Sequence, residues 1–256
     1  MSASALSAAR VGPASDDAGE REIRVQLAAC YRLLHRYAMT DLIYTHVSAR
    51  LPGREGHFLL NPYGLMFDEI TASNLIEVDG EGNAVGDDDW PVNPAGFVIH
   101  SAVLDGRKDV NCVLHTHTRA GIAVSTLECG LLPISQHALQ FYNRIAYHDY
   151  EGIACDLDER RRLVADLGDC NAMVLRNHGL LTVGRSVGEA FLLMFNLEQA
   201  CKIQIDAQAT GSLVAMPSEE VCEHTARQFD AGANVEKPAW RALLRQLDRD
   251  DPSYRD

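Results

Sequence analysis

Apolar residues recur with a helical period along some stretches of this chain and alternate with polar residues along others. From Glu20 to Met39 the apolar positions are three or four residues apart, which predicts an amphipathic helix. Residues 42–51 and 57–61 alternate around the turn sequence Pro52-Gly53 and predict a β-hairpin. Residues 75–85, with glycines at the centre, predict a second hairpin.

Capping signals place the next helices. Asn93 followed by Pro94 predicts the start of a short helix that ends near Gly106. Ser186 and Glu189 have the spacing of a capping box, which predicts a long helix to about Ala209. The remaining elements expected before it are a strand at 109–117, helices at 119–127 and 157–167, and a strand pair at 172–176 and 180–184.

These elements predict one large domain between two less regular ends. Residues 1–19 are small and polar and predict a mobile tail, and residues 20–210 carry the helices and hairpins. Residues 211–256 are more polar, and we expect a helical appendage there, with short helices near 218–229 and 238–247. Because hairpins join antiparallel strands, the fold class is α/β with a mixed, mainly antiparallel sheet.

Composition narrows the class of protein. The 256 residues are 46% hydrophobic and carry a formal charge of −13, which argues against nucleic acid or an anionic membrane as the partner. No apolar run reaches the roughly 18 residues of a membrane span. Seven cysteines without CxxC spacing fit reduced thiols, so we expect a cytoplasmic protein.

Three histidines stand out as possible metal ligands. His115 and His117 are two residues apart on a predicted strand, so their side chains share one face. His178 ends an apolar run and precedes Gly179. Three imidazoles suit a divalent metal that keeps open positions, although a strand-end histidine more often makes only structural hydrogen bonds.

The order of these motifs resembles the class II aldolase/adducin family over residues 22–210, and the wording is nearest to the adducin-head branch. The likeness rests on the Asn61-Pro62-Tyr63-Gly64 turn, the helix with His100, the His115-Thr116-His117 motif and the Asn177-His178-Gly179 motif. Further matching stretches are Leu42-Ile43-Tyr44-Thr45-His46, residues 95–102, residues 129–135 and residues 146–150.

The resemblance implies a three-layer αβα domain and a homotetramer with active sites at subunit interfaces. It also implies that His115, His117 and His178 bind a divalent metal. Zinc is the expected ion, with manganese or iron as alternatives. A small-molecule substrate is the expected partner.

The chain departs from the sugar-phosphate aldolases of the family at three places. Their Ser-Ser-Glu motif reads Pro94-Ala95-Gly96 here, so Gly96 stands where the catalytic Glu would be. Their Gly-Asn-x-Ser segment reads Thr45-His46-Val47-Ser48, and their Thr-Pro-x-Gly turn begins with Asn61. Fewer side chains remain to donate hydrogen bonds to a phosphate, so a phosphorylated sugar is not expected.

Other polar residues are candidates for substrate binding and proton transfer. His46, Asn61, Gly64 and His100 are the candidate substrate-binding residues, and the backbone of the turn at 61–64 could hold an anion. The family's catalytic Tyr falls near Gln136 or His137. The candidate catalytic residues are His137, Tyr142 and His148, because each could donate a proton.

Three functions remain open from the sequence. The first is a metal-dependent carbon–carbon lyase, by retro-aldol cleavage or decarboxylation, acting on a small non-phosphorylated oxo or hydroxy acid. The second is a non-haem iron oxygenase, since three neutral ligands leave room for substrate and dioxygen. The third is a non-catalytic binding or scaffold protein like adducin.

Overall fold

A computed structural model describes residues 16–86, 90–152, 157–232 and 238–256. Its seven strands form one sheet in the order β3-β2-β1-β4-β7-β6-β5. All neighbouring strands are antiparallel except β5 and β6, which are parallel. The strands are β1 (His46–Arg50), β2 (Phe58–Leu60), β3 (Ile76–Val78), β4 (Cys112–Thr116), β5 (Ile145–His148), β6 (Ala172–Leu175) and β7 (Gly179–Gly184). The predicted mixed, mainly antiparallel sheet is therefore confirmed.

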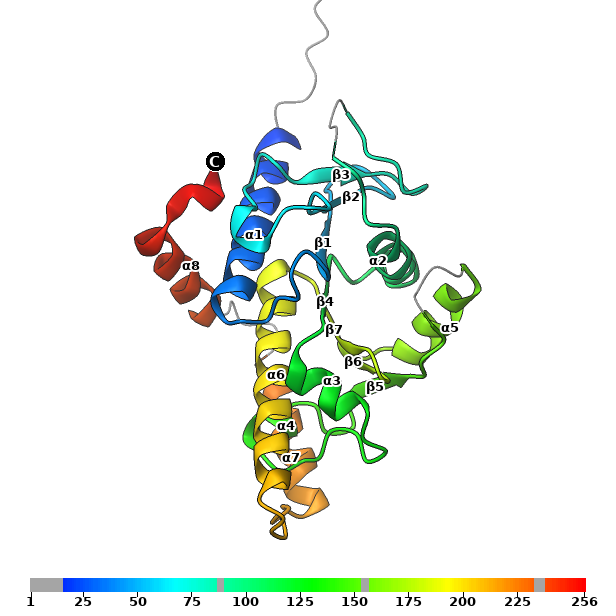
Figure 1. Cartoon of the computed structure of the whole chain (residues 1–256), viewed down its shortest axis with the longest axis vertical. Helices are drawn as coiled ribbons and strands as arrows, with labels where there is room; N and C mark the ends of the chain where they lie inside the picture. Colours follow the sequence, from blue (N-terminus) through cyan, green and yellow to red (C-terminus); the bar gives the residue numbers. More distant parts are fainter. Residues whose placement is uncertain (1–15, 87–89, 153–156, 233–237) are drawn as a thin grey trace, which may run out of the picture.

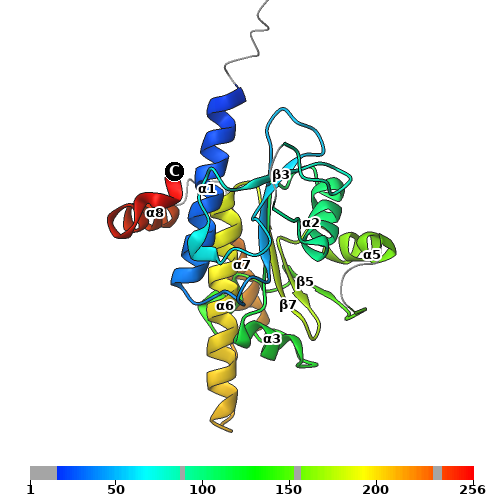
Figure 2. The same cartoon turned by 45° about the horizontal axis from the view of Figure 1, so that its top comes forward.

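Helices cover both faces of the sheet (Figures 1 and 2). On one face lie α1 (Asp16–Arg36) and α6 (Val187–Ala209), and on the other lie α2 (Pro94–Gly106) and α5 (Leu157–Leu167). Alternate residues of β4 pack in two separate hydrophobic cores, because successive side chains of a strand point to opposite faces of the sheet. Leu114 packs in the core with α1 and α6, whereas Val113 packs in the core with α2.

The C-terminal residues close the outer side of α1 (Figure 1). Helix α8 (Pro238–Asp250) and the 3-10 helix η2 (Pro252–Arg255) both contact α1. Tyr254 is fully buried, and its backbone oxygen accepts a hydrogen bond from the Ala72 N–H at 2.9 Å. The other helices are η1 (Phe67–Glu69), α3 (Arg119–Ser125), α4 (Gln136–Leu139) and α7 (Glu219–Ala231). Within the described ranges, no helix is long and apolar enough to cross a membrane.

Several predicted elements begin or end at other residues. Helix α1 begins at Asp16, so the last residues of the expected tail are helical, while residues 1–15 lie outside the described residues. Residues 16–19 have no large apolar side chain, so the spacing of apolar positions does not reveal that they are helical. Strand β1 begins at His46 rather than at residue 42, because Leu42 and Thr45 have positive φ angles of 50° and 71° and form a tight turn.

The capping box of α6 is shifted by one residue. Ser186 Oγ accepts a hydrogen bond from the Glu189 N–H at 3.2 Å, as the motif predicts. The Glu189 carboxylate, however, accepts from the backbone N–H of Arg185 at 2.9 Å. The cap therefore fixes the start of α6 and also the end of β7 that precedes it.

Candidate metal centre

Three histidine side chains meet where β4 ends and β6 turns into β7. The Nε2 atom of His117 lies 2.8 Å from Nε2 of His115 and 2.9 Å from Nε2 of His178. The possible ligand atoms of the three all lie within 4.8 Å of one another. Strands β4 and β7 pair directly, so the end of one strand and the start of the other bring the histidines together.

Hydrogen bonds at the other ring nitrogen orient two of these histidines. The Nδ1–H of His115 donates to the backbone oxygen of Leu180 at 2.9 Å. The Nδ1–H of His117 donates to Oδ2 of Asp41 at 3.1 Å. With the proton at Nδ1, each ring directs the lone pair of Nε2 towards the cluster, which is the tautomer that binds a metal.

Burial keeps two of the three histidines neutral. It lowers the pKa of His115 well below the usual value, and it lowers the pKa of His178 to about 4, with the neighbouring His117 adding to the effect. Neutral imidazoles are the form that ligates metals. Lone pairs that face one another at these distances need a cation between them, so the residues present fit a divalent metal ion.

The turn that carries His178 depends on its neighbours. Asn177 has a φ of 57°, a conformation that asparagine tolerates better than most residues. A Cβ atom on Gly179 would lie 2.3 Å from the backbone oxygen of Thr116. Only glycine fits this contact, so the His-Gly pair in the sequence reflects how closely the turn approaches β4.

A second group of polar side chains adjoins the cluster. His46 is directly opposite His115 in the β1–β4 register, and their ring centroids are 5.6 Å apart. Nδ1 of His46 lies 2.7 Å from Nε2 of His100, and Nδ1 of His100 lies 2.5 Å from Oγ of Ser48. His100 is fully buried with both ring nitrogens occupied, so its effect on a ligand would pass through His46.

Gly96 packs against this group. A Cβ atom at position 96 would lie 2.6 Å from Cδ2 of His46, closer than real contacts of this kind. The imidazole of His46 thus fills the space that a side chain at position 96 would need. The two departures from the aldolase pattern, at positions 46 and 96, therefore depend on each other, because histidine at 46 leaves no room for a side chain at 96.

The expected substrate residues of the 61–64 turn occupy different surroundings. Oδ1 of Asn61 accepts a hydrogen bond from the Tyr31 hydroxyl at 2.8 Å, and Nδ2 of Asn61 donates to the backbone oxygen of Pro62 at 3.3 Å. Gly64 has a φ of 122°. In the part of the chain that the structure describes, no hydrogen bond links Asn61 or Gly64 to the histidines.

Of the three candidate catalytic residues, His148 lies beside the metal centre. It lines a small cavity together with Tyr150 and His178. Its Nδ1–H donates to Oδ2 of Asp166 at 2.7 Å, and its buried Nε2 has no hydrogen-bond partner among the described residues. Oε1 of Glu159 is 3.7 Å away from that nitrogen.

His137 and Tyr142 contact other parts of the structure than the histidine cluster. His137 belongs to α4, which packs on α6 and α7. The backbone oxygen of Tyr142 accepts a hydrogen bond from Arg144 at 2.8 Å, and Arg144 also pairs with Glu223 of α7. Among the described residues, no hydrogen bond or ion pair joins His137 or Tyr142 to the histidine cluster.

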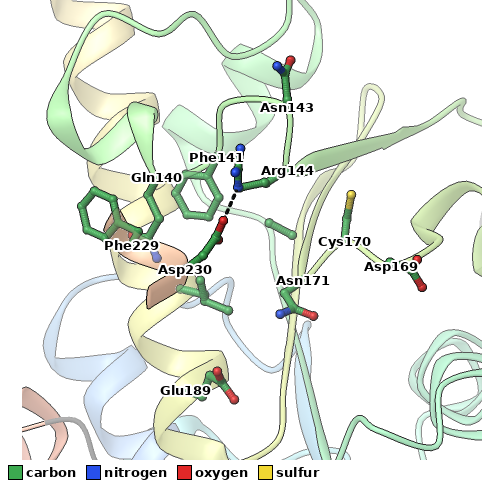
Figure 3. Close-up of a pocket in the computed structure, with 12 residues that line it drawn as sticks. Gln140, Phe141, Asn143, Arg144, Asp169, Cys170, Asn171, Glu189, Phe229 and Asp230 are labelled. Carbon is green, nitrogen blue, oxygen red and sulfur yellow. Dashed lines mark hydrogen bonds and ion pairs between the residues drawn. The ribbon is translucent and has the colours of Figure 1, made fainter. Parts of the chain in front are cut away.

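A larger cavity of about 310 Å³ lies at the other end of β6 (Figure 3). Arg144 and Asp230 face each other across it in an ion pair of 2.8 Å. Its lining includes Cys170 and Asn171, just before β6 begins, whereas His178 follows the end of that strand. No candidate site residue from the sequence lines this cavity, so it is separate from the metal centre.

Four residues of the centre had no role assigned from the sequence. Ser48 was part of a quoted motif but had no assigned role. Asp41, Glu159 and Asp166 had no signal at all, because a single acidic residue in a loop or on a helix is ordinary. Asp41 lies in the loop before β1, and Glu159 and Asp166 both lie on α5, so only the tertiary fold brings these carboxylates to their histidines.

The sequence profile described as the Class II Aldolase and Adducin N-terminal domain matches residues 25–205. The chain belongs to the class II aldolase and adducin family. Aldolases of this family are typically dependent on a divalent metal, and the three-histidine cluster gives this member a site suited to such an ion.

Known members of the family resemble the chain over most of its length. A crystal structure of an aldolase II superfamily protein from Pseudomonas syringae is 53% identical, with a TM-score of 0.89, covering 96% of this chain and 98% of that one. An L-fuculose 1-phosphate aldolase from Glaciozyma antarctica is 28% identical, with a TM-score of 0.83 and 96% of both chains covered. These family likenesses confirm the predicted fold.

The adducin side of the family is also similar. Alpha-adducin of Rattus norvegicus is 43% identical over 248 residues, which cover 91% of this chain and 34% of the adducin. The chain therefore corresponds to about a third of that longer protein. Family membership alone leaves both a catalytic and a binding role available.

Proposed function

We propose that the protein is a metal-dependent carbon–carbon lyase that acts on a small oxo or hydroxy acid without a phosphate group. The observation that carries this proposal is the convergence of three imidazoles beside the cavity that His148 lines, with His115 oriented by Leu180 and His117 by Asp41. A purely structural group of histidines would have no need of three lone pairs directed at one point.

His115, His117 and His178 would hold the ion, most simply zinc, with manganese or iron as alternatives. When bound, such an ion supplies a Lewis acid that stabilises the negative charge developing on an oxo acid's oxygen during carbon–carbon cleavage. His148, held by Asp166, has an Nε2 atom available to move a proton to or from the reacting carbon.

The loss of the family's Glu favours one branch of this chemistry. Gly96 offers no carboxylate, and His46 fills the adjoining space. Retro-aldol cleavage starts with removal of a hydroxyl proton by a base, whereas decarboxylation starts without one. The site therefore suits decarboxylation of an oxo acid at least as well as cleavage of a hydroxy acid.

The surroundings of Asn61 argue against a sugar phosphate as substrate. Oδ1 of Asn61 accepts from Tyr31 and one Nδ2 hydrogen donates to Pro62, so this side chain keeps at most one N–H for a phosphate. The L-fuculose 1-phosphate aldolase relative nevertheless makes this substrate the necessary comparison.

A substrate panel tests the proposal. Purified protein would be loaded with zinc, manganese or ferrous iron and assayed with aliphatic and aromatic oxo acids, hydroxy acids and L-fuculose 1-phosphate. We expect turnover of an oxo or hydroxy acid with zinc or manganese, and none in the His117→Ala variant, which lacks a ligand. Turnover of the sugar phosphate, with none of the acids cleaved, would overturn the proposal.

A second function, protein binding without catalysis, is favoured by the 43% identity to alpha-adducin. Metal content separates the two. A lyase should bind about one ion per chain through the three histidines, whereas a binding protein has no requirement for one. Iron together with substrate-dependent oxygen uptake would instead identify an oxygenase.

A further inference from the structure

Two consecutive hydrogen bonds, from Ser48 to His100 and from His100 to His46, restrict which ring nitrogen of each histidine is protonated. Each of the two contacts, at 2.5 Å and 2.7 Å, joins polar atoms that can share only one hydrogen. All three side chains are buried, and among the described residues neither imidazole has a carboxylate partner that would favour its charged form, so both are neutral. A neutral imidazole has one N–H and one lone pair, so the two contacts must run in the same direction.

Two directions are possible, and they differ at both ends of the chain. In the first, Ser48 donates to His100, His100 donates to His46, and the proton of His46 is on Nε2. In the second, His46 donates to His100, His100 donates to Ser48, and Nε2 of His46 has a bare lone pair. The first direction makes His46 a hydrogen-bond donor towards its free side, and the second makes it an acceptor.

The hydroxyl of Ser48 decides between them. Ser48 is fully buried, and within the described ranges His100 is its one side-chain hydrogen-bond partner. In the second direction the hydroxyl hydrogen of Ser48 would have no acceptor. A buried donor without an acceptor is unfavourable, so the first direction is preferred.

We propose that Ser48, acting through His100, holds His46 as the tautomer protonated on Nε2, so that His46 donates a hydrogen bond to an oxygen of a ligand at the metal centre. His46 bonds to His100 through Nδ1, and its Nε2 has no hydrogen-bond partner among the described residues; Gly96, whose Cβ position lies 3.0 Å from that nitrogen, adds no side-chain acceptor. His46 would contact the ligand, and Ser48 and His100 are positioning residues.

This arrangement indicates the class of ligand. A neutral N–H donor prefers an anionic or carbonyl oxygen and discriminates against ammonium groups. The carboxylate of a small oxo or hydroxy acid meets that requirement. The choice of ligand rests on the proposed function, whereas the tautomer of His46 does not.

The tautomer can be measured directly by ¹⁵N NMR of the imidazoles in the full-length, zinc-loaded protein. The His46 signals would be assigned by their loss in His46→Gln. We expect a protonated Nε2 and a bare Nδ1 in the wild type, and loss of this preference in Ser48→Ala. Ser48→Thr keeps the hydroxyl and should keep the wild-type tautomer. A bare Nε2 in the wild type, or a Ser48→Ala spectrum identical to it, overturns the proposal.

Binding of oxalate, a small dicarboxylate, tests what the donor does. At equal zinc content, we expect Ser48→Ala to weaken oxalate binding about tenfold, the size of one lost hydrogen bond to a charged group, with Ser48→Thr close to the wild type. Equal binding by Ser48→Ala and Ser48→Thr would overturn the ligand-donor role. If both results hold but no oxo or hydroxy acid is turned over, the proposed lyase function fails and the role of His46 stands.

Discussion

Asp41 is the residue that holds His117 in position, and it does so from a strained loop. The loop turns between Asp41 and Tyr44, and Leu42 and Thr45 both have positive φ. Thr45 is β-branched, so this conformation is unfavourable for it, and its buried hydroxyl finds no hydrogen-bond partner in the described part of the chain. Strain of this kind is often retained at functional sites, where it fixes a side chain that the chemistry needs.

The first prediction concerns metal affinity. Asp41→Ala removes the acceptor of the His117 Nδ1–H, and loss of such a partner typically lowers affinity about 10–100-fold. Competition with a chromogenic chelator would measure it. Asp68→Ala is the matched control, because Asp68 is similarly exposed and also faces a histidine, His35, at 3.7 Å. Equal affinities in the two variants would contradict the role given to Asp41.

The second prediction concerns Gly96. Gly96→Ala forces a Cβ atom against His46 and should destabilise the protein by about 1–3 kcal/mol, as overpacked sites do. Gly19→Ala is the control, because Gly19 lies in α1 with open space around its Cβ position and should gain up to about 1 kcal/mol. Urea unfolding measures both. Similar effects in the two variants would show that the site accommodates a side chain.

At the level of single residues, the sequence predicted what spacing alone can fix. His115 and His117 share a face because side chains alternate along a strand, and His178 precedes a glycine that only a close turn requires. Asp41 could not be predicted, because its place depends on positive φ at residues that rarely adopt it. The pairing of His148 with Asp166 depends on how α5 packs, which no local pattern encodes.

Among the elements, the long helices and the hairpins at 46–60 and 172–184 were predictable, and β5 was not. Of the hairpin expected at 75–85 only β3 is a strand, joined to the return segment by an isolated bridge between Val78 and Ala84. Strand β5 is four residues long and lies at the edge of the sheet, beside a parallel partner. A pattern of four residues is too short to separate strand from loop. Parallel strands are not joined by a tight turn, so no turn sequence predicts the pairing of β5 with β6. Helix α4, also four residues long, escaped for the same reason.

The third prediction concerns the C-terminal element. Tyr254 is fully buried, and its hydroxyl donates to Asp248 at 2.8 Å, which secures η2 against α8. Tyr254→Ala should cost about 3 kcal/mol, as for other large buried aromatics. Leu213→Ala is the control, because Leu213 is fully exposed and should change stability by less than about 0.5 kcal/mol. A small effect at Tyr254 would mean that the C-terminal residues add little to the fold.

For the whole molecule, the fourth prediction is a homotetramer with active sites at subunit interfaces. The family resemblance motivates it, and several large apolar side chains are exposed in the isolated chain, including Leu42, Tyr44 and Met216. Sedimentation at micromolar concentration should give about four times the 28.1 kDa mass of one chain. A single species with the mass of one chain would refute this prediction.

The fifth prediction is that the metal-free protein loses stability as the pH falls from 7 to 5. Burial lowers the pKa values of His46, His100 and His115, so these groups stay neutral in the folded state. In the unfolded state they take up protons below about pH 6.5. Each therefore reduces the free energy of unfolding by about 1.4 kcal/mol per pH unit between about pH 6.5 and its folded pKa.

Urea unfolding at several pH values, with chelator present, measures this dependence. His100→Gln should give a shallower slope, because it removes one buried group that the unfolded state protonates. A wild-type stability that is flat from pH 7 to 5 would show that the buried histidines are solvated or already charged.

The contact between Gly96 and His46 also restricts the order in which mutations could convert one form of this site into the other. A chain with a side chain at position 96 cannot accept the imidazole in its present place, because a Cβ atom there would overlap the ring. Glycine at 96 must therefore come before histidine at 46, and the reverse route must lose the histidine first. Histidine at 46 would be harmful in a chain that has a side chain at position 96, and glycine at 96 alone would bring no gain. Attempts to restore an aldolase glutamate by a single substitution should fail in this chain, and libraries that vary both positions together are the route across.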